Sequence, residues 1–518
     1  MDTMDTMIKN IVIVGGGSAG WLTAGLLAAE HNAKQQQSID ITLIESPNVN
    51  TLGVGEGTWP SMRNTLDKIG ISELEFIQQC DVSLKQGSKF INWCNTQPND
   101  FYYHPFMTPE GYSQVDLQGY WHKSQTPQAY ADTVNVQHHL CQVGLAPKQF
   151  NTPPYAGVTN YGYHLNAGKF AHLLQQHCTK KLAVTHVIGH IEQIINSESG
   201  DIHHLLTTDG KIINGDLFID CSGSKGLLIN QHFDIPLIEQ HTSLFNNCAL
   251  ATQVPYTTNN AIASATLSTA QTSGWIWDIG LSSRRGVGHT YSSQHIGDDM
   301  AEQQLRQYIS ASIGPQESEK LSLRKLSFTP GYREKFWHKN CVAVGMSAGF
   351  IEPLEASALA MVELSITMIS EQLPQNRQQM EIVAKRFNSR FTYRWQRVIE
   401  FLKLHYMLSA RRDSDYWCDN QLPASIPERL TELLKLWQYQ PPSRYDFIEN
   451  EEVFPSASYQ YILYGMGFNT QSRKYPSHHD NSSLAAKVFA NVQQQKQQYQ
   501  EGLPSNRALI DHYGQLSV

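Results

Sequence analysis

The sequence lacks an excess of positive charge. It contains 39 Lys and Arg against 47 Asp and Glu, which gives a net charge of −8 at pH 7. Nucleic-acid binding needs concentrated basic residues that neutralise phosphates. The doublets Arg284-Arg285 and Arg411-Arg412 are too short for this purpose, and we interpret them as solvated surface pairs. We therefore expect no nucleic-acid partner.

Paired cysteines and metal-ligand motifs are also missing. None of the eight cysteines belongs to a C-x-x-C motif, and their scattered spacing is typical of reduced thiols in a cytoplasmic enzyme. The 21 histidines include no H-E-x-x-H motif or comparable set. We therefore predict no metal site.

A long hydrophobic run is absent from the start of the chain. Residues Met1 to Asn10 carry acidic side chains and no basic segment, and the apolar run Ile11–Val14 is interrupted by glycine. Such a segment is neither a signal peptide nor a membrane span. We expect a cytoplasmic protein without membrane contact.

A nucleotide-binding pattern is present in the same region. The β-branched run Ile11–Val14 stops at Gly15-x-Gly17-x-x-Gly20, helix formers follow over Trp21–Glu30, and a second strand, Ile39–Ile44, ends in Glu45. The three glycines permit a tight turn, close approach of a pyrophosphate and helix–strand packing, while the acid would bind a ribose hydroxyl. Because the motif stands between a strand and a helix, it predicts dinucleotide binding.

Two later segments resemble the same kind of strand end. Asp216–Asp220 runs into Cys221-Ser222-Gly223, and Cys341–Val344 runs into Gly345. If these strands join the first one in a single sheet, their carboxyl ends converge on one ligand. These two further segments favour FAD over NAD, because a flavin is longer than one βαβ site. Since the glycine fingerprint occurs once, the sequence shows no separate NAD(P)H site and predicts that electrons arrive from outside the chain.

The fold class is therefore predicted as α/β with mixed α+β layers. We expect a Rossmann-type domain over residues 8–370, built from about 8–60, 160–230 and 320–370. An inserted β-sheet layer would come from about 61–160 and 231–320, with strand-like runs in it and nearby at Trp275–Leu281 and Leu182–Ile195. Residues 371–518, which include Gln375–His405 and Pro427–Trp437, are predicted as a mainly helical subdomain that completes the substrate pocket.

Ten segments together resemble the flavin-dependent tryptophan halogenases. They are Gly15–Trp21, Gly53–Thr58, Leu84–Phe90, Tyr102–Phe106, Tyr161–Leu165, Asp216–Leu228, Gly274–Leu281, Gly331–Trp337, Cys341–Leu359 and His405–Trp417. The resemblance implies the glutathione-reductase-like fold of the flavin monooxygenase superfamily. It also implies reduced FAD from a separate flavin reductase, oxygen, chloride or bromide as co-substrate, and hypohalous acid that travels to an indole. The residues that it assigns to FAD binding are Gly15, Gly17, Ser18, Ala19, Gly20, Glu45, Gly55, Val187, Gly345, Met346 and Leu359.

The same resemblance implies two catalytic residues. Lys85 would polarise the oxidant as an ammonium or carry the halogen as an amine. From its position alone, Lys85 would be interpreted as a surface lysine on an amphipathic helix over Gln78–Phe90, and only the resemblance favours the catalytic role. Glu355 would stabilise the cationic ring intermediate and take its proton. The neighbouring acid Glu352 is the alternative, since either carboxylate could instead cap a helix.

The remaining implied roles concern aromatic residues and the halide. Trp275 and Trp277, which lie on the same face of a strand, would screen the flavin from the substrate, although two core tryptophans fit the spacing as well. His104 and Phe106 would sandwich the indole, with a packed aromatic loop as the alternative. Ser357 and Ala358 would form the halide site.

The chain departs from the family pattern at three places. Gly280 replaces a proline, Asn166 replaces an aspartate, and Ala356-Ser357-Ala358 replaces S-T-G. Alanine at a glycine position can forbid a positive φ or narrow the halide pocket. An aromatic monooxygenase and a flavin-binding protein that has lost halogenation therefore stay open as alternatives. The sequence also leaves a monomer and a homodimer open.

Overall fold

A six-stranded sheet forms the first half of the molecule in the computed structural model, which describes residues 7–32, 39–48, 55–124, 128–257, 260–471 and 481–517. Its strand order is β20-β21-β12-β1-β2-β8, and all its pairs are parallel except β20-β21. The strands are β1 (Asn10–Val14), β2 (Asp40–Glu45), β8 (Thr185–Ile188), β12 (Leu217–Asp220), β20 (Trp337–His338) and β21 (Cys341–Ala343). The prediction that the three glycine-terminated strands share one sheet is confirmed.

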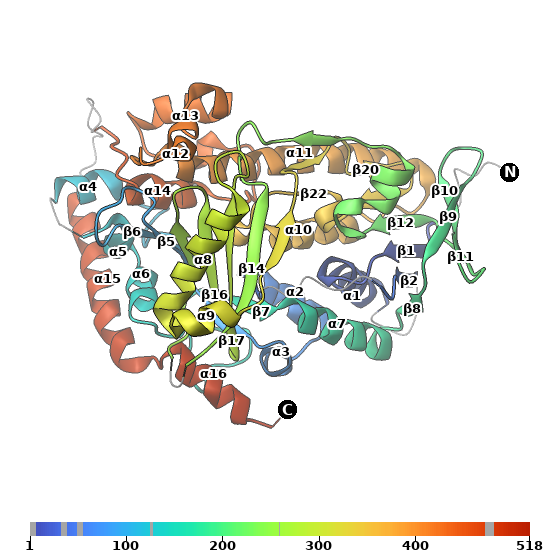
Figure 1. The fold of residues 1–518 in the computed structure, drawn as a ribbon, viewed down its shortest axis with the longest axis horizontal. Helices are drawn as coiled ribbons and strands as arrows, with labels where there is room; N and C mark the ends of the chain where they lie inside the picture. The colour runs from blue at the N-terminus through green and yellow to red at the C-terminus, as the bar shows by residue number, and fades with distance from the viewer. Residues whose placement is uncertain are drawn as a thin grey trace.

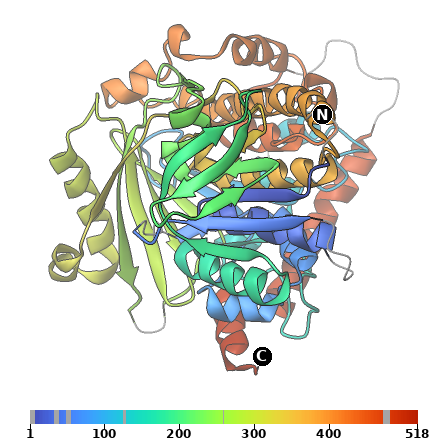
Figure 2. The same ribbon diagram turned by 90° about the vertical axis from the view of Figure 1, so that its right-hand side faces the viewer.

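Both faces of this sheet are covered, as the apolar parallel strands require. Ile11 and Ile13 of β1 join the core that contains α1 (Ser18–Asn32), α7 (Ala167–Lys181) and α10 (Ser357–Glu371). Val12 and Val14 instead pack under a three-stranded sheet of β9 (Ile191–Asn196), β10 (Ile202–Thr207) and β11 (Ile212–Asn214). Figure 2 shows this small sheet lying across the first one.

The second half of the molecule contains a seven-stranded sheet in the order β18-β14-β17-β16-β15-β5-β6. Its strands are β5 (Gly87–Ile91), β6 (Phe101–Pro105), β14 (Cys248–Pro255), β15 (Thr266–Ala270), β16 (Trp275–Gly280), β17 (Arg284–Tyr291) and β18 (Arg324–Ser327). Helix α8 (Asp298–Ile313) packs against Ile276 on one face, while Trp275 and Trp277 enter the main core. The predicted strand at Trp275–Leu281 is confirmed by β16.

Two three-stranded sheets complete the β structure. One is β3-β7-β4, and its middle strand pairs with both neighbours. The six strands of these two sheets are β3 (Gly55–Gly57), β4 (Ser83–Lys85), β7 (Gly162–Asn166), β13 (Leu237–Glu239), β19 (Gly331–Arg333) and β22 (Gly349–Phe350). Asn166, the residue that replaces an aspartate, caps α7 by accepting a hydrogen bond from the backbone N–H of Lys169. Asparagine and aspartate are equally good helix caps, so this departure leaves the fold intact.

The C-terminal part of the described chain is helical. Its longest element is α11, which starts after the capping residue Asn376 and runs along the upper side of Figure 1 from β20 to α14. The remaining helices are α2 (Ser61–Ile69), α3 (Glu73–Gln79), α4 (Gln118–Lys123), α5 (Tyr130–Val134), α6 (Val136–Gln142), α9 (Pro315–Lys320), α11 (Arg377–Met407), α12 (Asp415–Asp419), α13 (Glu428–Trp437), α14 (Ser456–Gly465), α15 (Ser482–Gly502) and α16 (Asn506–Gln515). The helices predicted near Gln375–His405 and Pro427–Trp437 are confirmed.

The alternative of a surface helix over Gln78–Phe90 is wrong. Helix α3 ends at Gln79, and the chain continues into β4 and β5. Gly87 adopts a φ of 157°, and a Cβ there would lie 2.4 Å from the carbonyl oxygen of His104, so this position is built for close strand pairing and not for a helix. Lys85 is consequently buried rather than solvated.

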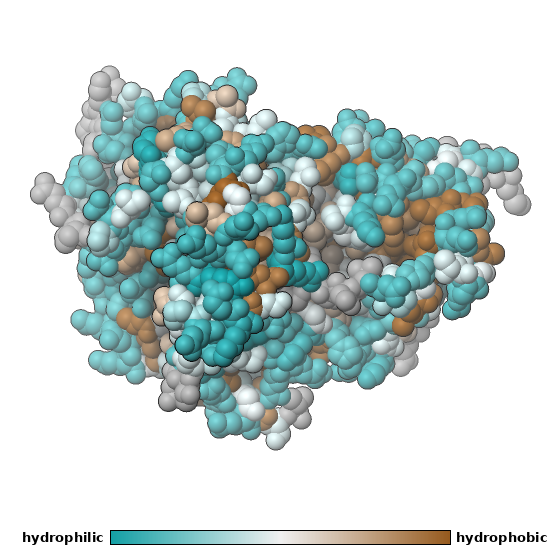
Figure 3. Space-filling model, in the orientation of Figure 1, coloured by the Kyte–Doolittle hydropathy of each residue, from teal (hydrophilic) through white to brown (hydrophobic). Residues whose placement is uncertain are grey.

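The face shown in Figure 3 is mostly polar, with apolar side chains at the end of the molecule that carries β8 to β11. Ile188 and Ile212 are the most exposed of the large apolar residues on these strands. Within the part of the chain that the structure describes, no helix combines the length and the hydropathy of a membrane span.

Candidate active site

The predicted nucleotide motif lies at the carboxyl end of β1. Gly15 has a φ of 117°, and a Cβ at this position would lie 2.3 Å from the carbonyl oxygen of Cys221. A Cβ on Gly20 would lie 1.9 Å from the carbonyl oxygen of Gly15. Gly17 faces open space, with no heavy atom within 4 Å of such a Cβ. The motif thus packs tightly at Gly15 and Gly20 and leaves room for a ligand at Gly17, beside the first turn of α1.

Other predicted cofactor residues surround this turn. Ser18 and Ala19 open α1, and Gly345, with a φ of 75°, packs against the Cβ of Ala19. Met346 follows in a short 3-10 turn, Gly345–Ser347. Leu359, in contrast, lies in the first turn of α10 and is buried.

Glu45 lies at the end of β2, where a ribose-binding acid is expected. Its side chain covers Gly16, and its Oε1 accepts a hydrogen bond from His186 Nε2 at 2.7 Å. Val187 is next to His186 on β8 and pairs with Ile44. Sequence reasoning missed His186, although its place beside Val187 on the neighbouring strand could have indicated it.

The predicted residue Gly55 lies away from this group, on β3. A Cβ there would approach Ile279 of β16 at 3.1 Å, so the glycine permits close packing between β3 and the second sheet. Gly53 and Val54 of the same motif lie outside the described residues. The structure therefore places Gly55 between the two sheets and the other predicted cofactor residues around the first sheet and α10.

Lys85 ends β4 and is completely buried, with a relative exposure of 0%. No hydrogen-bond partner of its Nζ atom occurs among the described residues, and the ring of Phe106 lies 5.3 Å away. Burial lowers the pKa of Lys85 to about 8, although the carboxylate of Glu355 opposes this shift. An amine with this pKa and no competing partner is available for chemistry.

Glycine 57 brings the lysine and the glutamate segment together. A Cβ on Gly57 would lie 3.1 Å from Lys85 Nζ, 3.3 Å from Ala356 Cβ and 3.6 Å from His164 Cδ2. His164 is fully buried, and burial lowers its pKa well below the ordinary value. The amine therefore lies beside a neutral imidazole and beside the residue that follows Glu355.

The glutamate segment is strained. Glu355 and Ala356 have φ values of 64° and 55°, a left-handed conformation that side-chain-bearing residues rarely adopt. Ser357 and Ala358 then enter α10 with helical geometry. Ala358 therefore needs no positive φ, and the left-handed strain falls on Glu355 and Ala356 instead. Alanine at 358 fits a helix as well as glycine does.

Glu355 is buried and held by two imidazoles. His104 Nδ1 donates to its Oε1 at 2.8 Å, and His405 Nε2 lies 3.4 Å from the same oxygen. Ser88 Oγ donates to Oε2 at 3.3 Å. Burial alone would raise the pKa of Glu355, but the two histidines hold it well below its usual range. The carboxylate therefore stays ionised beside Lys85.

Glu352 serves a different purpose, and it is not a helix cap. Its Oε2 accepts hydrogen bonds from Trp275 Nε1 at 2.8 Å, Tyr406 Oη at 2.6 Å and Asn246 Nδ2 at 2.6 Å. Burial raises its pKa. Trp277 lies with its ring 6.3 Å from that of Trp275, edge to face. The Glu352 side chain thus ties the tryptophan strand to the end of α11.

An aromatic wall adjoins the Glu355 carboxylate. His104 has both nitrogens engaged, since Nε2 bonds Ser458 Oγ at 2.9 Å, so its ring faces are held in place. Phe401 and Phe454 stack with ring centres 3.8 Å apart, and the His104 ring lies 5.6 Å from Phe401. Phe106 lies on the lysine side instead. The structure places His104 at the glutamate and Phe106 at Lys85, not together.

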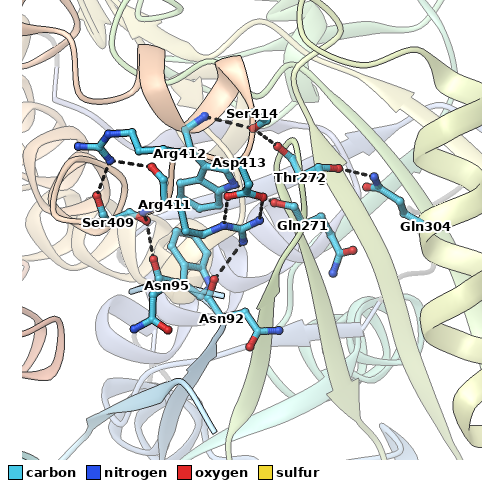
Figure 4. Close-up of polar contacts among 12 residues, drawn as sticks. Asn92, Asn95, Gln271, Thr272, Gln304, Ser409, Arg411, Arg412, Asp413 and Ser414 are labelled. Atoms are coloured by element: carbon cyan, nitrogen blue, oxygen red, sulfur yellow. Dashed lines mark hydrogen bonds and ion pairs between the residues drawn. The ribbon is translucent and has the colours of Figure 1, made fainter. Parts of the chain in front are cut away.

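A clasp of residues 409–414 fixes α11 against the second sheet (Figure 4). Arg411 donates to the carbonyl oxygen of Asn92 at 3.0 Å, pairs with Asp413 at 2.7 Å and lies over the ring of Trp417. Ser414 Oγ donates to the carbonyl oxygen of Thr272 at 2.5 Å. The interpretation of Arg411 as a solvated surface residue is wrong, because its guanidinium is buried in this clasp.

These features define a cofactor-dependent enzyme: a nucleotide-binding strand–helix junction and, beyond it, a buried amine next to a buried carboxylate. Within the described residues, no group of three or more His, Cys, Asp or Glu side chains could hold a metal ion. Comparison with known proteins identifies the family. The sequence pattern of the tryptophan halogenases matches residues 10–481.

Individual relatives cover the same range. Tryptophan 7-halogenase RebH of Lentzea aerocolonigenes is 31% identical over 81% of this chain and 80% of its own length. Tryptophan 6-halogenase ThaL of Streptomyces albogriseolus is 30% identical over 98% of this chain and 99% of its own. The crystal structure of a tryptophan halogenase from Shewanella frigidimarina is 51% identical, covers 99% of both chains and gives a TM-score of 0.95.

The chain belongs to the tryptophan halogenase family. Members of this family are flavin-dependent halogenases, which share an FAD-binding Rossmann-like fold. The fold class predicted from the sequence is thereby confirmed, and so is the prediction of a flavin enzyme.

Proposed function

We propose that this enzyme uses reduced FAD, oxygen and chloride or bromide to halogenate an indole such as tryptophan. The observation that carries the proposal is the meeting of Lys85 and the Glu355 segment at Gly57, where nothing larger than glycine fits without displacing them. A buried amine that lies beside Gly57, next to Ala356 and within the electrostatic influence of the Glu355 carboxylate, can receive an oxidised halogen, and the carboxylate can serve a nearby aromatic ring.

The residues around the first sheet fit FAD. Gly15, Gly17, Ser18, Ala19 and Gly20 would hold the pyrophosphate at the start of α1, because the first N–H groups of a helix lack partners within it. Open space beside Gly17 supports this placement. The other residues that would line the cofactor are Glu45, Gly55, Val187, Gly345, Met346 and Leu359. Bound reduced FAD supplies, with oxygen and halide, the hypohalous acid.

Lys85 would receive that acid. As an amine it can exchange one hydrogen for the halogen and release water; as an ammonium it can donate a hydrogen bond that polarises the oxidant. Its lack of a partner and its pKa of about 8 leave both forms accessible near neutral pH. An aromatic hydroxylase would have no use for such a lysine.

Glu355 would act on the substrate ring. Its ionised carboxylate stabilises the positive charge that develops when the halogen adds, and then accepts the ring proton. His104 orients the carboxylate, and the wall of Phe401 and Phe454 suits an electron-rich ring. Phe106 would separate this ring from Lys85 or contact it directly.

The halide would bind at Ser357 and Ala358. The preceding left-handed residues Glu355 and Ala356 turn the chain so that α10 begins beside Lys85, and free N–H groups at a helix start attract an anion. Because Ala358 is helical, its side chain introduces no backbone strain. This supports a working halide site over a protein that has lost halogenation.

Trp275 and Trp277 would screen the flavin from the substrate. Their burial and the hydrogen bond of Trp275 to Glu352 support a fixed screen. A separate flavin reductase would supply the reduced cofactor in the cytoplasm, since only one nucleotide fingerprint occurs in the chain. A homodimer is compatible with this function.

Mass spectrometry tests the proposal. Purified protein would be supplied with FAD, a generic flavin reductase, NADH, oxygen and bromide or chloride, and offered tryptophan and indole in parallel. A product with the isotope pattern of the added halogen is expected. A hydroxylated product would indicate a monooxygenase, and no product from either ring despite bound FAD would contradict the proposal.

A further inference from the structure

The two oxygens of Glu355 have different environments. Oε1 lies against two imidazoles, His104 Nδ1 at 2.8 Å and His405 Nε2 at 3.4 Å. Among the residues that the structure describes, Oε2 has one hydrogen-bond partner, the hydroxyl of Ser88 at 3.3 Å. This asymmetry bears on which oxygen can take up a proton.

The hairpin of β5 and β6 creates the asymmetry. Ser88 and His104 are directly opposite in the register, as are Phe90 and Tyr102. Cross-strand partners share a face, and residues two apart along a strand do so too. One face of the hairpin therefore presents both Ser88 and His104 to the carboxylate. Both side chains are buried, with exposures of 3% and 7%.

Each imidazole also bonds a hydroxyl group on the side away from Glu355. Ser458 Oγ bonds His104 Nε2 at 2.9 Å, and Tyr102 Oη bonds His405 Nδ1 at 2.7 Å. A carboxylate only accepts, so His104 Nδ1 carries the hydrogen that it donates to Oε1, whereas His405 Nε2, at 3.4 Å, makes no hydrogen bond to any described residue. A protonated Oε1 would then direct its own hydrogen at an N–H donor, which is unfavourable.

Ser88 can satisfy both protonation states of Glu355. A serine hydroxyl donates one hydrogen bond and accepts others, and its hydrogen rotates freely. It donates to Oε2 while the carboxylate is ionised, and it can accept from Oε2 once that oxygen carries a proton. Neither imidazole can change roles in this way without a new tautomer.

We propose that Oε2 of Glu355 takes the proton that leaves the substrate ring, and that Ser88 is the positioning residue whose hydroxyl then reverses its hydrogen bond. The inference rests on the proposed function. In this step the ring C–H bond breaks and its electron pair restores the aromatic ring. The proton forms an O–H bond at Oε2, and the carboxyl group donates to Ser88 Oγ.

The test is Ser88→Ala, measured with ordinary and ring-deuterated indole and bromide. We expect kcat to fall about tenfold with KM nearly unchanged, the size of one hydrogen bond to a charged group. We also expect a normal deuterium isotope effect on kcat that exceeds the wild-type value, because proton removal becomes slower. A loss of packing alone would not produce that isotope effect.

Two further variants serve as controls. Ser88→Thr keeps the hydroxyl on a strand residue and should restore kcat and the wild-type isotope effect. Ser318→Ala, a matched change at a buried serine that bonds the carbonyl oxygen of Arg306, should alter neither. If Ser88→Ala matches an active wild-type enzyme in kcat and isotope effect, the inference is overturned. If the wild type itself forms no halogenated product, the proposed function fails and the inference falls with it.

Discussion

The cofactor side and the substrate side of this molecule are built by different means. Around β1 and α1, the backbone itself forms the binding surface: Gly15 and Gly20 pack too closely on neighbouring backbone to carry a side chain, and Gly17 leaves open space. Around Glu355, side chains from β5, β6 and α11 meet on one carboxylate, and Ser458 of α14 holds one of them, His104. In a binding surface made of backbone, substitutions at a few positions should be strongly damaging. In a side-chain network, substitutions at many positions should each have a smaller effect.

The sharpest separation of the two sides is Lys85→Ala. We expect halogenated product to fall by about 10³-fold, in the range of a lost catalytic group, while FAD binding and oxygen consumption continue. Product would be measured by mass spectrometry and oxygen with an electrode. Lys89→Ala is the control, because Lys89 bonds Gln142 on the far side of β5. Substantial product from Lys85→Ala would remove the lysine from the chemistry.

The cofactor side is tested by Gly17→Val. Because the space beside Gly17 is open, the side chain should be accommodated without FAD but should exclude the pyrophosphate. We expect FAD affinity to fall about 100-fold, about 2.7 kcal/mol, with an unchanged melting temperature of the FAD-free protein. Fluorescence titration and thermal unfolding measure the two quantities. Gly119→Ala, also in open space but remote, is the matched control, and equal affinity in both variants would argue against this FAD site.

The pH dependence of kcat distinguishes the two forms of Lys85 that could act on the halogen. If the neutral amine carries the halogen, kcat should rise about tenfold per pH unit below its pKa of about 8 and level off above it. A rate that falls over the same range would show that the ammonium is the active form. Lys85→Arg should abolish this limb of the profile, since a guanidinium does not lose its proton there.

The free energy of unfolding should also depend on the titration of Lys85. The folded pKa of Lys85 lies below the unfolded value, so the unfolded chain binds more protons between about pH 8 and 10.5. The free energy of unfolding should therefore gain a contribution from Lys85 as pH rises through this range. Lys85→Met, which has no charge to bury, should lack that gain when urea unfolding is compared at both ends.

The smallest expected effect on chemistry comes from the clasp. Arg411→Ala leaves the carboxylate of Asp413 and the carbonyl of Asn92 without their donor, and should lower the free energy of unfolding by about 2 kcal/mol. FAD affinity should not change, because the clasp lies on the substrate side. Urea unfolding and flavin titration measure the two effects. A matched loss of FAD affinity would show that the two sides are not independent.

The sequence predicted the cofactor side better than the substrate side. The motif at Gly15–Gly20 with Glu45 is local, and its consequences follow from the allowed conformations of glycine and the alternation of strand and helix. The helix alternative around Lys85 failed because Ser83–Ile91 is short and almost entirely buried and so carries little periodic signal. In addition, Gly87 makes a close contact with His104 that only the paired strand reveals.

For several residues on the substrate side, nothing in the sequence indicated a functional role. Ser88, His405 and Ser458 are far apart in the chain, and each is an ordinary residue for its own element. Glu352 and Glu355 share one short motif, yet one carboxylate binds Trp275 and the other binds two histidines. Spacing alone could not separate them.

The sequence by itself determined the strand–glycine–helix unit, the single nucleotide fingerprint, the long helix from residue 377 and the family. Each depends on neighbours in the chain, where local sterics and periodic burial act. Only the tertiary structure decided that Lys85 is buried, that the strain falls on Glu355 and Ala356, and that Oε2 meets Ser88. Those properties arise from contacts between distant segments, because desolvation and hydrogen bonding depend on what surrounds a group in space.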